Sequence, residues 1–424
     1  MIREKLTSRM GKDVVWTFVI QITIMLCAFV ITKLLSNRLS IEDFGQYNVV
    51  KRSVQVISFV MLAGVGIALP RYIPLYQKGE KPKPIAPLLA ASFIYILGIS
   101  MVVCLICWVF SGEMQQLVLG DGGNTTLFIV ALAYAFTLAM AQLIYSYYRG
   151  TGNFKWYNGA GLLVSLSIIV PLVALPILTT MNVFTSWLIV TTALVVFFFV
   201  RELRMMDIVP MAISTVKEEL RTIIKYSSGR MVADFFLFSL SAFPLIYISN
   251  SQGLQPTAYY SVGVTFVTMV TPLFSFMGII LLPYVSECIA KKELGKADNF
   301  INRLLQLYVA SSLAITAVLY LFTEFFTWLF FSPSYIITAD LSRIMILAIM
   351  PQTLYLLYRN PIDAVSDIPY NTIILGICLV VMIMTFTLAS TLTQLAWAYT
   401  IVSALQGQLT WLTWLILNRK FATK

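Results

Sequence analysis

The chain has 424 residues, of which 59% are Ala, Val, Ile, Leu, Met, Phe, Trp, Tyr or Cys and 11% are charged, against about 25% charged residues in an average soluble domain. So few charges cannot cover a polar surface, which excludes a soluble globular fold. The chain has no histidine, and this excludes an imidazole proton relay, a histidine-ligated metal and a Ser-His-Asp triad. The composition predicts a membrane protein that crosses the bilayer many times, without catalytic or metal-ligating residues.

Apolar segments of bilayer-spanning length, roughly 20 residues each, follow one another along the whole chain, separated by polar breaks or by breaks with Gly and Pro. In chain order they are Val14–Leu35, Tyr47–Leu69, Ile85–Phe110, Leu127–Tyr148, Gly159–Leu178, Phe184–Val200, Met231–Ile248, Tyr260–Leu282, Leu304–Phe331, Leu341–Tyr358, Thr372–Leu388 and Leu392–Leu417. We therefore predict an all-α fold of twelve transmembrane helices.

The basic residues predict the orientation of these helices. Of the 29 Lys and Arg residues, 23 lie in the two terminal segments and in the even-numbered connections. Because cytoplasmic segments retain Lys and Arg, both termini are predicted to be cytoplasmic. The net charge of +10 is accounted for by this orientation, so no nucleic-acid partner is predicted.

The connections on the predicted outer side are short, and the longest, Ser111–Thr126, leaves no room for a catalytic domain. The sequence also lacks the Gly-x-x-x-x-Gly-Lys-Ser/Thr loop that binds nucleotide phosphates. We therefore expect a transporter rather than an enzyme, driven by an ion gradient or by the downhill use of its substrate.

The sequence matches itself at an offset of about half its length. At an offset of 213 the matching pairs are Ser36-Asn37 with Ser249-Asn250, Tyr47 with Tyr260, and Leu69-Pro70 with Leu282-Pro283. We predict two parallel six-helix lobes, residues 1–200 and 226–424, joined by a basic cytoplasmic linker, residues 201–225. This is the plan of alternating-access transporters with parallel repeats.

One pair of cations interrupts this internal match. The first copy has Lys51-Arg52 where the second copy has Val264-Thr265. Charges inside a span usually mark a substrate pathway or a partner, so the pair is a candidate cationic wall of a cavity between the lobes. The alternative is that both side chains reach the outer interface, because the pair lies only about 7 Å into the predicted span, four to five residues at 1.5 Å each.

Arg230 and Asp234 form a second candidate group in the seventh predicted span. Their spacing of four residues places them on one helix face. They are either a structural ion pair or an anion-binding arginine held by an acid that couples transport to H⁺ or Na⁺. Three other charges, Lys33, Glu324 and Arg343, lie near span ends and are expected at the interface.

The stretch Leu39-Ser40-Ile41-Glu42-Asp43-Phe44-Gly45-Gln46-Tyr47 resembles the turn between the first two helices of polysaccharide exporters of the multidrug/oligosaccharidyl-lipid/polysaccharide (MOP) superfamily. Ala258-Tyr259-Tyr260-Ser261 is similar to the corresponding turn after their seventh helix, and Tyr148-Arg149-Gly150 fits the inner end of their fourth. Within this group the chain most resembles the Wzx-type O-antigen flippases, which implies a MATE-like fold.

The resemblance implies movement of undecaprenyl-diphosphate-linked oligosaccharide units for lipopolysaccharide or another surface glycan. The movement would run from the cytoplasmic to the periplasmic leaflet of a bacterial inner membrane. In such flippases a cation-lined cavity is thought to hold the diphosphate and sugars, and this maps by helix and depth onto Lys51, Arg52 and Arg230. The resemblance implies no cofactor beyond a coupling ion, and partners among the membrane proteins of O-antigen assembly.

Three other functions remain open from the sequence. A drug/cation antiporter of the same superfamily would need acids in its cavity, and Asp234 is the chief candidate. A membrane glycosyltransferase or O-antigen polymerase is disfavoured by the short outer loops and by the duplication. A scaffold that transports nothing is disfavoured by the charges within the spans.

Overall fold

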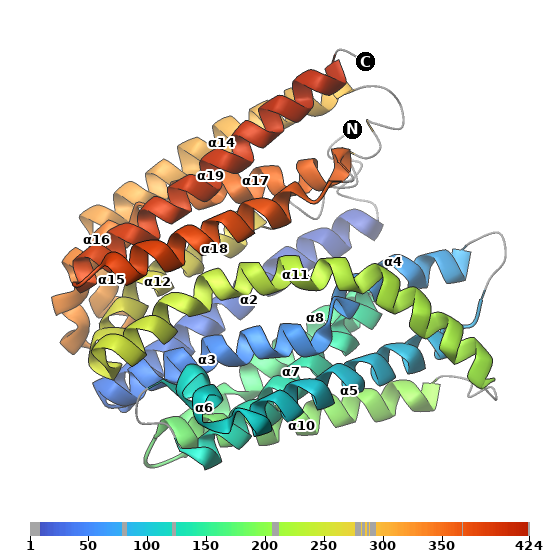
Figure 1. Ribbon diagram of the computed structural model, residues 1–424, viewed down its shortest axis with the longest axis horizontal. Helices are drawn as coiled ribbons and strands as arrows, with labels where there is room; N and C mark the ends of the chain where they lie inside the picture. The colour runs from blue at the N-terminus through green and yellow to red at the C-terminus, as the bar shows by residue number, and fades with distance from the viewer. Residues whose placement is uncertain are drawn as a thin grey trace. The chain divides into compact units, whose positions relative to one another are not determined.

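The computed structural model describes residues 9–78, 83–120, 124–205, 212–275, 294–366 and 368–422, together with Leu281, Val285 and Cys288 (Figure 1). The described residues contain helices, turns and bends but no strand, so the prediction of an all-α chain is confirmed there. The chain divides into two compact units, which meet between Phe238 and Ser239.

The first unit holds nine complete helices within its described residues and the first part of a tenth. They are α2 (Arg9–Arg38), α3 (Ile41–Leu62), α4 (Val65–Lys78), α5 (Ala86–Val109), α6 (Ser111–Leu119), α7 (Thr125–Gly150), α8 (Phe154–Ser167), α9 (Ile169–Ala174), α10 (Thr180–Met205) and α11 (Ile213–Gln252). Helix α7 packs against α3, α4 and α10, so it lies at the centre of this unit (Figure 1).

The second unit contains the remainder of α11 and the C-terminal helices. They are α12 (Leu254–Ser275), α14 (Leu294–Leu321), α15 (Thr323–Phe330), the 3₁₀ helix η1 (Pro333–Thr338), α16 (Ala339–Ile346), α17 (Ile349–Val365), α18 (Tyr370–Leu388) and α19 (Leu392–Ala422). Helix α19 packs against α16, α17 and α18. Both units place a short helix directly after a long apolar one, α6 after α5 and α15 after α14, which agrees with the predicted duplication.

Ten described helices are long and apolar enough to cross a membrane. Two further spans are bent pairs, α3 with α4 and η1–α16 with α17, which raises the number to twelve if each pair counts as one span. Each predicted span overlaps one of these twelve. The bends, of 40° and 44°, were not predicted, because an apolar run gives no sign of where a helix changes direction.

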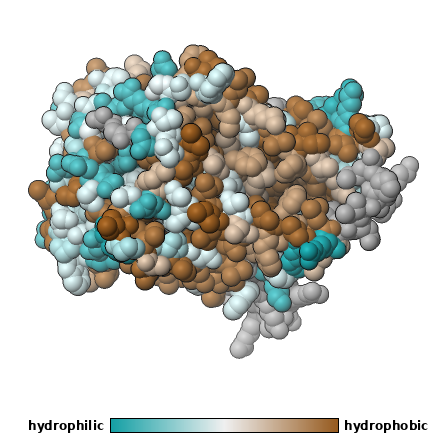
Figure 2. Space-filling model, turned by 90° about the horizontal axis from the view of Figure 1, so that it is seen from below, coloured by the Kyte–Doolittle hydropathy of each residue, from teal (hydrophilic) through white to brown (hydrophobic). Residues whose placement is uncertain are grey.

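Much of the molecular surface is apolar, as expected of helices that face lipid (Figure 2). Trp108, Ile177 and Leu388 each expose more than two thirds of their side-chain surface. A soluble protein rarely exposes such continuous apolar areas. The chain is therefore a multi-pass membrane protein.

The predicted linker, residues 201–225, is helical wherever it is described, apart from Ala212. Helix α10 continues to Met205, and α11 begins at Ile213 and runs through Tyr226 into the seventh span without a break. The first part of α11 belongs to the first unit, so that unit extends beyond the predicted lobe of residues 1–200.

Candidate functional site

Helix α3, which carries the candidate cations, begins at a capped turn within the stretch 39–47. Ser40 is the N-cap, and its Oγ accepts a hydrogen bond from the backbone N–H of Asp43 at 3.0 Å, which satisfies one amide left free at the helix start. The Asp43 carboxylate accepts a hydrogen bond from the Thr180 hydroxyl at 3.2 Å. This contact joins the start of α3 to the start of α10 and fixes the position of the cations further along α3.

Lys51 and Arg52 lie at the middle of α3, which begins at Ile41. Lys51 is ten residues from that start, about 15 Å along the axis at 1.5 Å per residue. Helix α3 begins six residues before the apolar run, and the depth of about 7 Å into the predicted span stays a prediction. Both side chains are half-buried.

Lys51 and Arg52 each contact an uncharged side chain. The Nζ of Lys51 lies 5.5 Å from the ring centroid of Tyr47, within the range of a cation–π contact. The Nη1 of Arg52 donates a hydrogen bond to Gln55 Oε1 at 3.4 Å. Among the described residues no carboxylate forms an ion pair with Lys51, so this ammonium group keeps its charge available for an anion.

The Tyr47 ring that contacts Lys51 belongs to a cluster of buried aromatic side chains. Tyr47 is 2% exposed, and its ring centroid lies 5.9 Å from that of Phe184 and 5.8 Å from that of Trp187. Tyr134 contacts the same two rings at 5.9 and 6.2 Å. We call Tyr47, Tyr134, Phe184 and Trp187 the aromatic cluster. Because it joins α3, α7 and α10, it holds the Lys51 contact rigidly.

The second unit repeats this aromatic arrangement without the cations. Tyr260, the counterpart of Tyr47, is fully buried and packs edge-on against Phe386 and Tyr399, each at 6.4 Å between centroids. At the positions that match the cation pair, Val264 is buried and the Thr265 hydroxyl donates to its own helix backbone. The two units thus share an aromatic support, and the cation pair belongs to the first unit alone.

The second span breaks immediately after the cation-bearing helix. Ala63 and Gly64 have φ of 48° and 76°, in the left-handed region that ends helices. A Cβ at Gly64 would lie 2.7 Å from the Ser227 carbonyl oxygen, so only glycine lets α11 approach so closely. This approach places α11 against the bend between α3 and α4.

A carbonyl freed in α4 explains one of the basic residues. Pro70 has no N–H and leaves the Gly66 carbonyl without its helical donor. Ser146 Oγ donates to that carbonyl at 3.2 Å, and Arg149 Nη2 donates at 2.7 Å. Unpaired backbone groups are costly in a bilayer, so Arg149 has a structural role here.

The neighbours of Arg149 have structural roles as well. A Cβ at Gly150 would lie 3.0 Å from the Leu69 carbonyl oxygen, so the glycine permits close packing of α7 on α4. The Tyr148 hydroxyl donates to Glu202 Oε1 at 2.8 Å, which ties α7 to α10. The Tyr148-Arg149-Gly150 sequence therefore joins α7 to α4 and α10 within the first unit.

The second candidate group is described only in part. Arg230 lies in α11, but its side chain is outside the described part of the chain. Asp234 is half-buried one turn further on. A stacked ring pair, Phe59 and Phe238 with centroids 3.8 Å apart, holds this part of α11 against α3. The pairing of Arg230 with Asp234, and the approach of Arg230 to Lys51 and Arg52, stay predictions.

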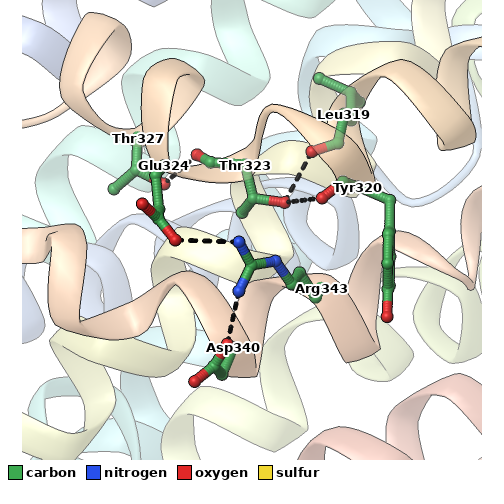
Figure 3. Close-up of polar contacts among 7 residues, drawn as sticks. All are labelled: Leu319, Tyr320, Thr323, Glu324, Thr327, Asp340 and Arg343. Atoms are coloured by element: carbon green, nitrogen blue, oxygen red, sulfur yellow. Dashed lines mark hydrogen bonds and ion pairs between the residues drawn. The ribbon is translucent and has the colours of Figure 1, made fainter.

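Arg343 in the second unit is engaged on both sides by acids (Figure 3). Its Nη2 lies 2.9 Å from Glu324 Oε1 and its Nη1 lies 2.6 Å from Asp340 Oδ1. These ion pairs join α15 to α16 at a surface where both carboxylates are exposed. The arginine stabilises this connection and adds no free positive charge.

In the part of the chain that the structure describes, no three His, Cys, Asp or Glu side chains come close enough to hold a metal ion. The prediction that the protein has no cofactor, other than a coupling ion, stays a prediction.

Comparison with known proteins identifies one family and one fold. A family model described as "Polysaccharide biosynthesis protein" matches residues 10–289, more than half of the chain. A search of curated proteins finds no match. Among solved structures, the lipid II flippase MurJ in an inward closed conformation superimposes with a TM-score of 0.73 at 12% identity, covering 96% of this chain and 90% of MurJ.

Two further solved structures have the same fold. An inward-facing multidrug resistance MATE family transporter of the MOP superfamily superimposes with a TM-score of 0.68 at 13% identity, covering 95% of this chain and 96% of the transporter. A MOP superfamily transporter from Pyrococcus furiosus, described as having a binding pocket of reverse polarity, gives 0.62 at 15% identity, covering 97% and 94%. At such low identity the likeness shows a MATE-like fold.

Proposed function

Because the chain belongs to the polysaccharide biosynthesis protein family, we propose that it is a flippase for undecaprenyl-diphosphate-linked repeat units of O-antigen or a similar surface glycan. It moves them from the cytoplasmic to the periplasmic leaflet of a bacterial inner membrane, in which both of its termini face the cytoplasm. Other membrane proteins of glycan assembly supply and take up these units.

One observation carries the proposal: Lys51 and Arg52 are charged residues within α3, the first part of a bent candidate span, whereas their counterparts in the second copy are neutral. Charged residues are costly in a membrane interior and are usually functional there. An ammonium group and a guanidinium on adjacent residues suit a diphosphate, to which arginine donates paired hydrogen bonds. The described contacts of Lys51 leave its charge free for such a substrate.

In this mechanism the cations replace the water around the diphosphate. A diphosphate and a glycan cannot cross hydrocarbon unaided, because each unpaired polar or charged group there costs several kcal/mol. We propose that Lys51, Arg52 and Arg230 line a cavity that holds the diphosphate while the prenyl chain stays in lipid. Alternating access then opens the cavity to one leaflet at a time, and Asp234 couples the cycle to H⁺ or Na⁺.

A multidrug antiporter is the second candidate function, favoured by the likeness to a multidrug MATE transporter over nearly the whole length of both chains. Cationic drugs call for an acidic cavity. Of the candidate residues here three are cations and one, Asp234, is an acid, so we place the lipid-linked glycan first.

The test uses a double variant, Arg52→Ala with Arg230→Ala, expressed from a plasmid in a strain that lacks the gene. We expect surface glycan to fall at least tenfold while the variant reaches the membrane in normal amounts, because the diphosphate loses two charge-assisted contacts. Lys155→Ala with Arg303→Ala is the matched control, since it removes two exposed cations and should restore glycan fully.

Normal glycan display by the well-expressed Arg52/Arg230 variant would overturn the assignment. Efflux of cationic dyes by the wild-type chain, abolished by Asp234→Asn and unaffected by the arginine variants, would establish the antiporter instead.

A further inference from the structure

The first part of α11, residues Ile213–Ser227, is a two-sided helix at the predicted cytoplasmic end of the first unit. Glu219, Ile223 and Ser227 follow one another at intervals of four residues and are all buried. Lys217, Arg221 and Lys225 each lie two positions before one of these buried residues, which places them about 160° away around the helix axis. All three are exposed. The segment therefore has one face fixed to the protein and one face turned outward.

Polar contacts with α4 hold the inner face in place. The Tyr76 hydroxyl donates a hydrogen bond to Glu219 Oε2 at 2.5 Å, and both groups are buried. The Arg71 guanidinium lies 4.5 Å from the ring centroid of Tyr226, a cation–π contact. These contacts with α4 fix which residues of α11 face outward.

The outward face is a basic stripe, which we define as Lys217, Arg221 and Lys225. The three cations recur every four residues, so they lie one above another on the helix, and all three are exposed. Ile213 and Ile224 are exposed beside them, by 86% and 42%. Cations together with exposed isoleucines are typical of a helix that lies at a membrane interface.

The stripe also lies only a few residues before a candidate membrane span in the sequence. Lys225 is six residues before Met231, where the apolar spanning part of α11 begins. Figure 1 shows that α11 changes direction between its first part and the spanning part. The stripe is thus carried by a helix that turns away from the direction of its own span, as a helix at the membrane surface does.

We propose that the basic stripe binds the anionic phospholipid headgroups of the cytoplasmic leaflet. The headgroup phosphates pair with the ammonium and guanidinium groups, and Ile213 and Ile224 contact the start of the acyl chains. The proposal does not depend on which substrate the protein transports. An acidic partner protein is the rival occupant, but the exposed isoleucines and the short distance to the span favour lipid.

The experiment measures the thermal unfolding of the purified full-length protein in detergent, with added dioleoyl phosphatidylglycerol or dioleoyl phosphatidylethanolamine. A ligand that binds the folded state raises the melting temperature. We expect the anionic lipid to raise it more than the zwitterionic lipid at low salt, and this difference to shrink at high salt because the charges are screened.

The site is tested by Lys217→Gln, Arg221→Gln and Lys225→Gln together. We expect the apparent affinity for phosphatidylglycerol to fall by roughly fivefold for each cation removed. The control, Lys155→Gln with Arg204→Gln and Arg303→Gln, removes three exposed cations outside the stripe and should keep the preference. Equal losses in the two triple variants, or a wild-type protein with no preference, would overturn the proposal.

A second measurement needs no variant and decides the matter if the stripe variant fails to fold. Wild-type protein is cross-linked to a phosphatidylglycerol with a photoreactive headgroup, and the labelled peptides are mapped. We expect labelling to concentrate on residues 213–226. Labelling spread evenly over the other basic segments would contradict the proposal.

Discussion

At Gly64 two independent constraints meet at a single residue. The backbone has a φ of 76°, and an added Cβ would lie 2.7 Å from the Ser227 carbonyl oxygen. We predict that Gly64→Ala lowers the free energy of unfolding by about 1–3 kcal/mol, because a strained backbone conformation and a contact with rigid backbone atoms both oppose the substitution. Thermal unfolding of the purified protein measures the loss.

Gly98 is the matched control for this substitution. It lies inside α5, and an added Cβ meets nothing within 4 Å. Gly98→Ala should leave stability unchanged or raise it by about 0.5–1 kcal/mol, the helix propensity gained. A Gly64→Ala protein as stable as Gly98→Ala would show that α11 does not approach the bend as described.

Arg38 and Arg343 show which properties of a basic residue the sequence alone does not reveal. Arg38, near the end of the first span, donates to the carbonyls of Leu172 and Leu175 at 2.5 and 2.6 Å, and Arg343 is engaged by two acids. A sequence shows that a basic residue lies near a span end. It does not show that the side chain forms hydrogen bonds or ion pairs with carbonyls or carboxylates far away in the sequence. Only the three-dimensional contacts separate these structural cations from Lys51.

At the scale of helices, the break in the second span depends on a neighbouring helix. Arg149 and Ser146 of α7 both donate to the Gly66 carbonyl that Pro70 leaves free in α4. We predict that Arg149→Ala lowers the free energy of unfolding by about 1–3 kcal/mol, the cost of losing a charged donor to a buried acceptor. Arg149→Lys should lose less. Thermal or denaturant unfolding in detergent measures both.

Arg303→Ala serves as the control for Arg149→Ala. Arg303 is exposed on α14, and its removal should change stability by no more than about 0.5 kcal/mol. If Arg149→Ala and Arg303→Ala behave alike, the hydrogen bond to Gly66 contributes nothing, and Arg149 becomes available as a substrate contact.

The apolar runs located every candidate span but not the ends and breaks of the helices. The start of α3 was missed by six residues, because its first turn carries Glu42 and Asp43, which are polar yet favourable near a helix N-terminus. The bends at Gly64 and Leu347 lie inside apolar runs, where hydropathy does not change. Capping and packing decide these features, and they act between segments far apart in the sequence.

At the scale of the whole molecule, the charge distribution predicts an orientation that surface labelling can test. Ser334 is exposed in a connection predicted to be periplasmic, and Ser214 is exposed in one predicted to be cytoplasmic. In a background without the natural cysteines, Ser334→Cys should react with a membrane-impermeant maleimide in intact cells. Ser214→Cys should react only after permeabilisation.

The reverse labelling pattern would overturn the predicted orientation. Labelling of both positions in intact cells would contradict the odd number of spans, the seventh to the ninth, that is predicted between them.

The sequence singled out the candidate cations but not the side chains that surround them. The internal repeat singled out Lys51 and Arg52 by comparison with Val264 and Thr265, and it also matched Tyr47 with Tyr260. It could not show that both tyrosines sit in aromatic clusters, because Phe184 and Trp187 are more than a hundred residues from Tyr47. The repeated tyrosine was the one signal of that cluster in the sequence.

Helix α11 has a mechanical consequence for the molecule. The boundary between the two units falls between Phe238 and Ser239, inside a continuous helix, so the chain passes from one unit to the other without a loop. A rotation of one unit against the other would have to bend or twist this helix. Pro244, six residues past Phe238, has no amide N–H, so one backbone hydrogen bond of the helix is missing there. If the helix bends at Pro244, such a rotation has a defined axis.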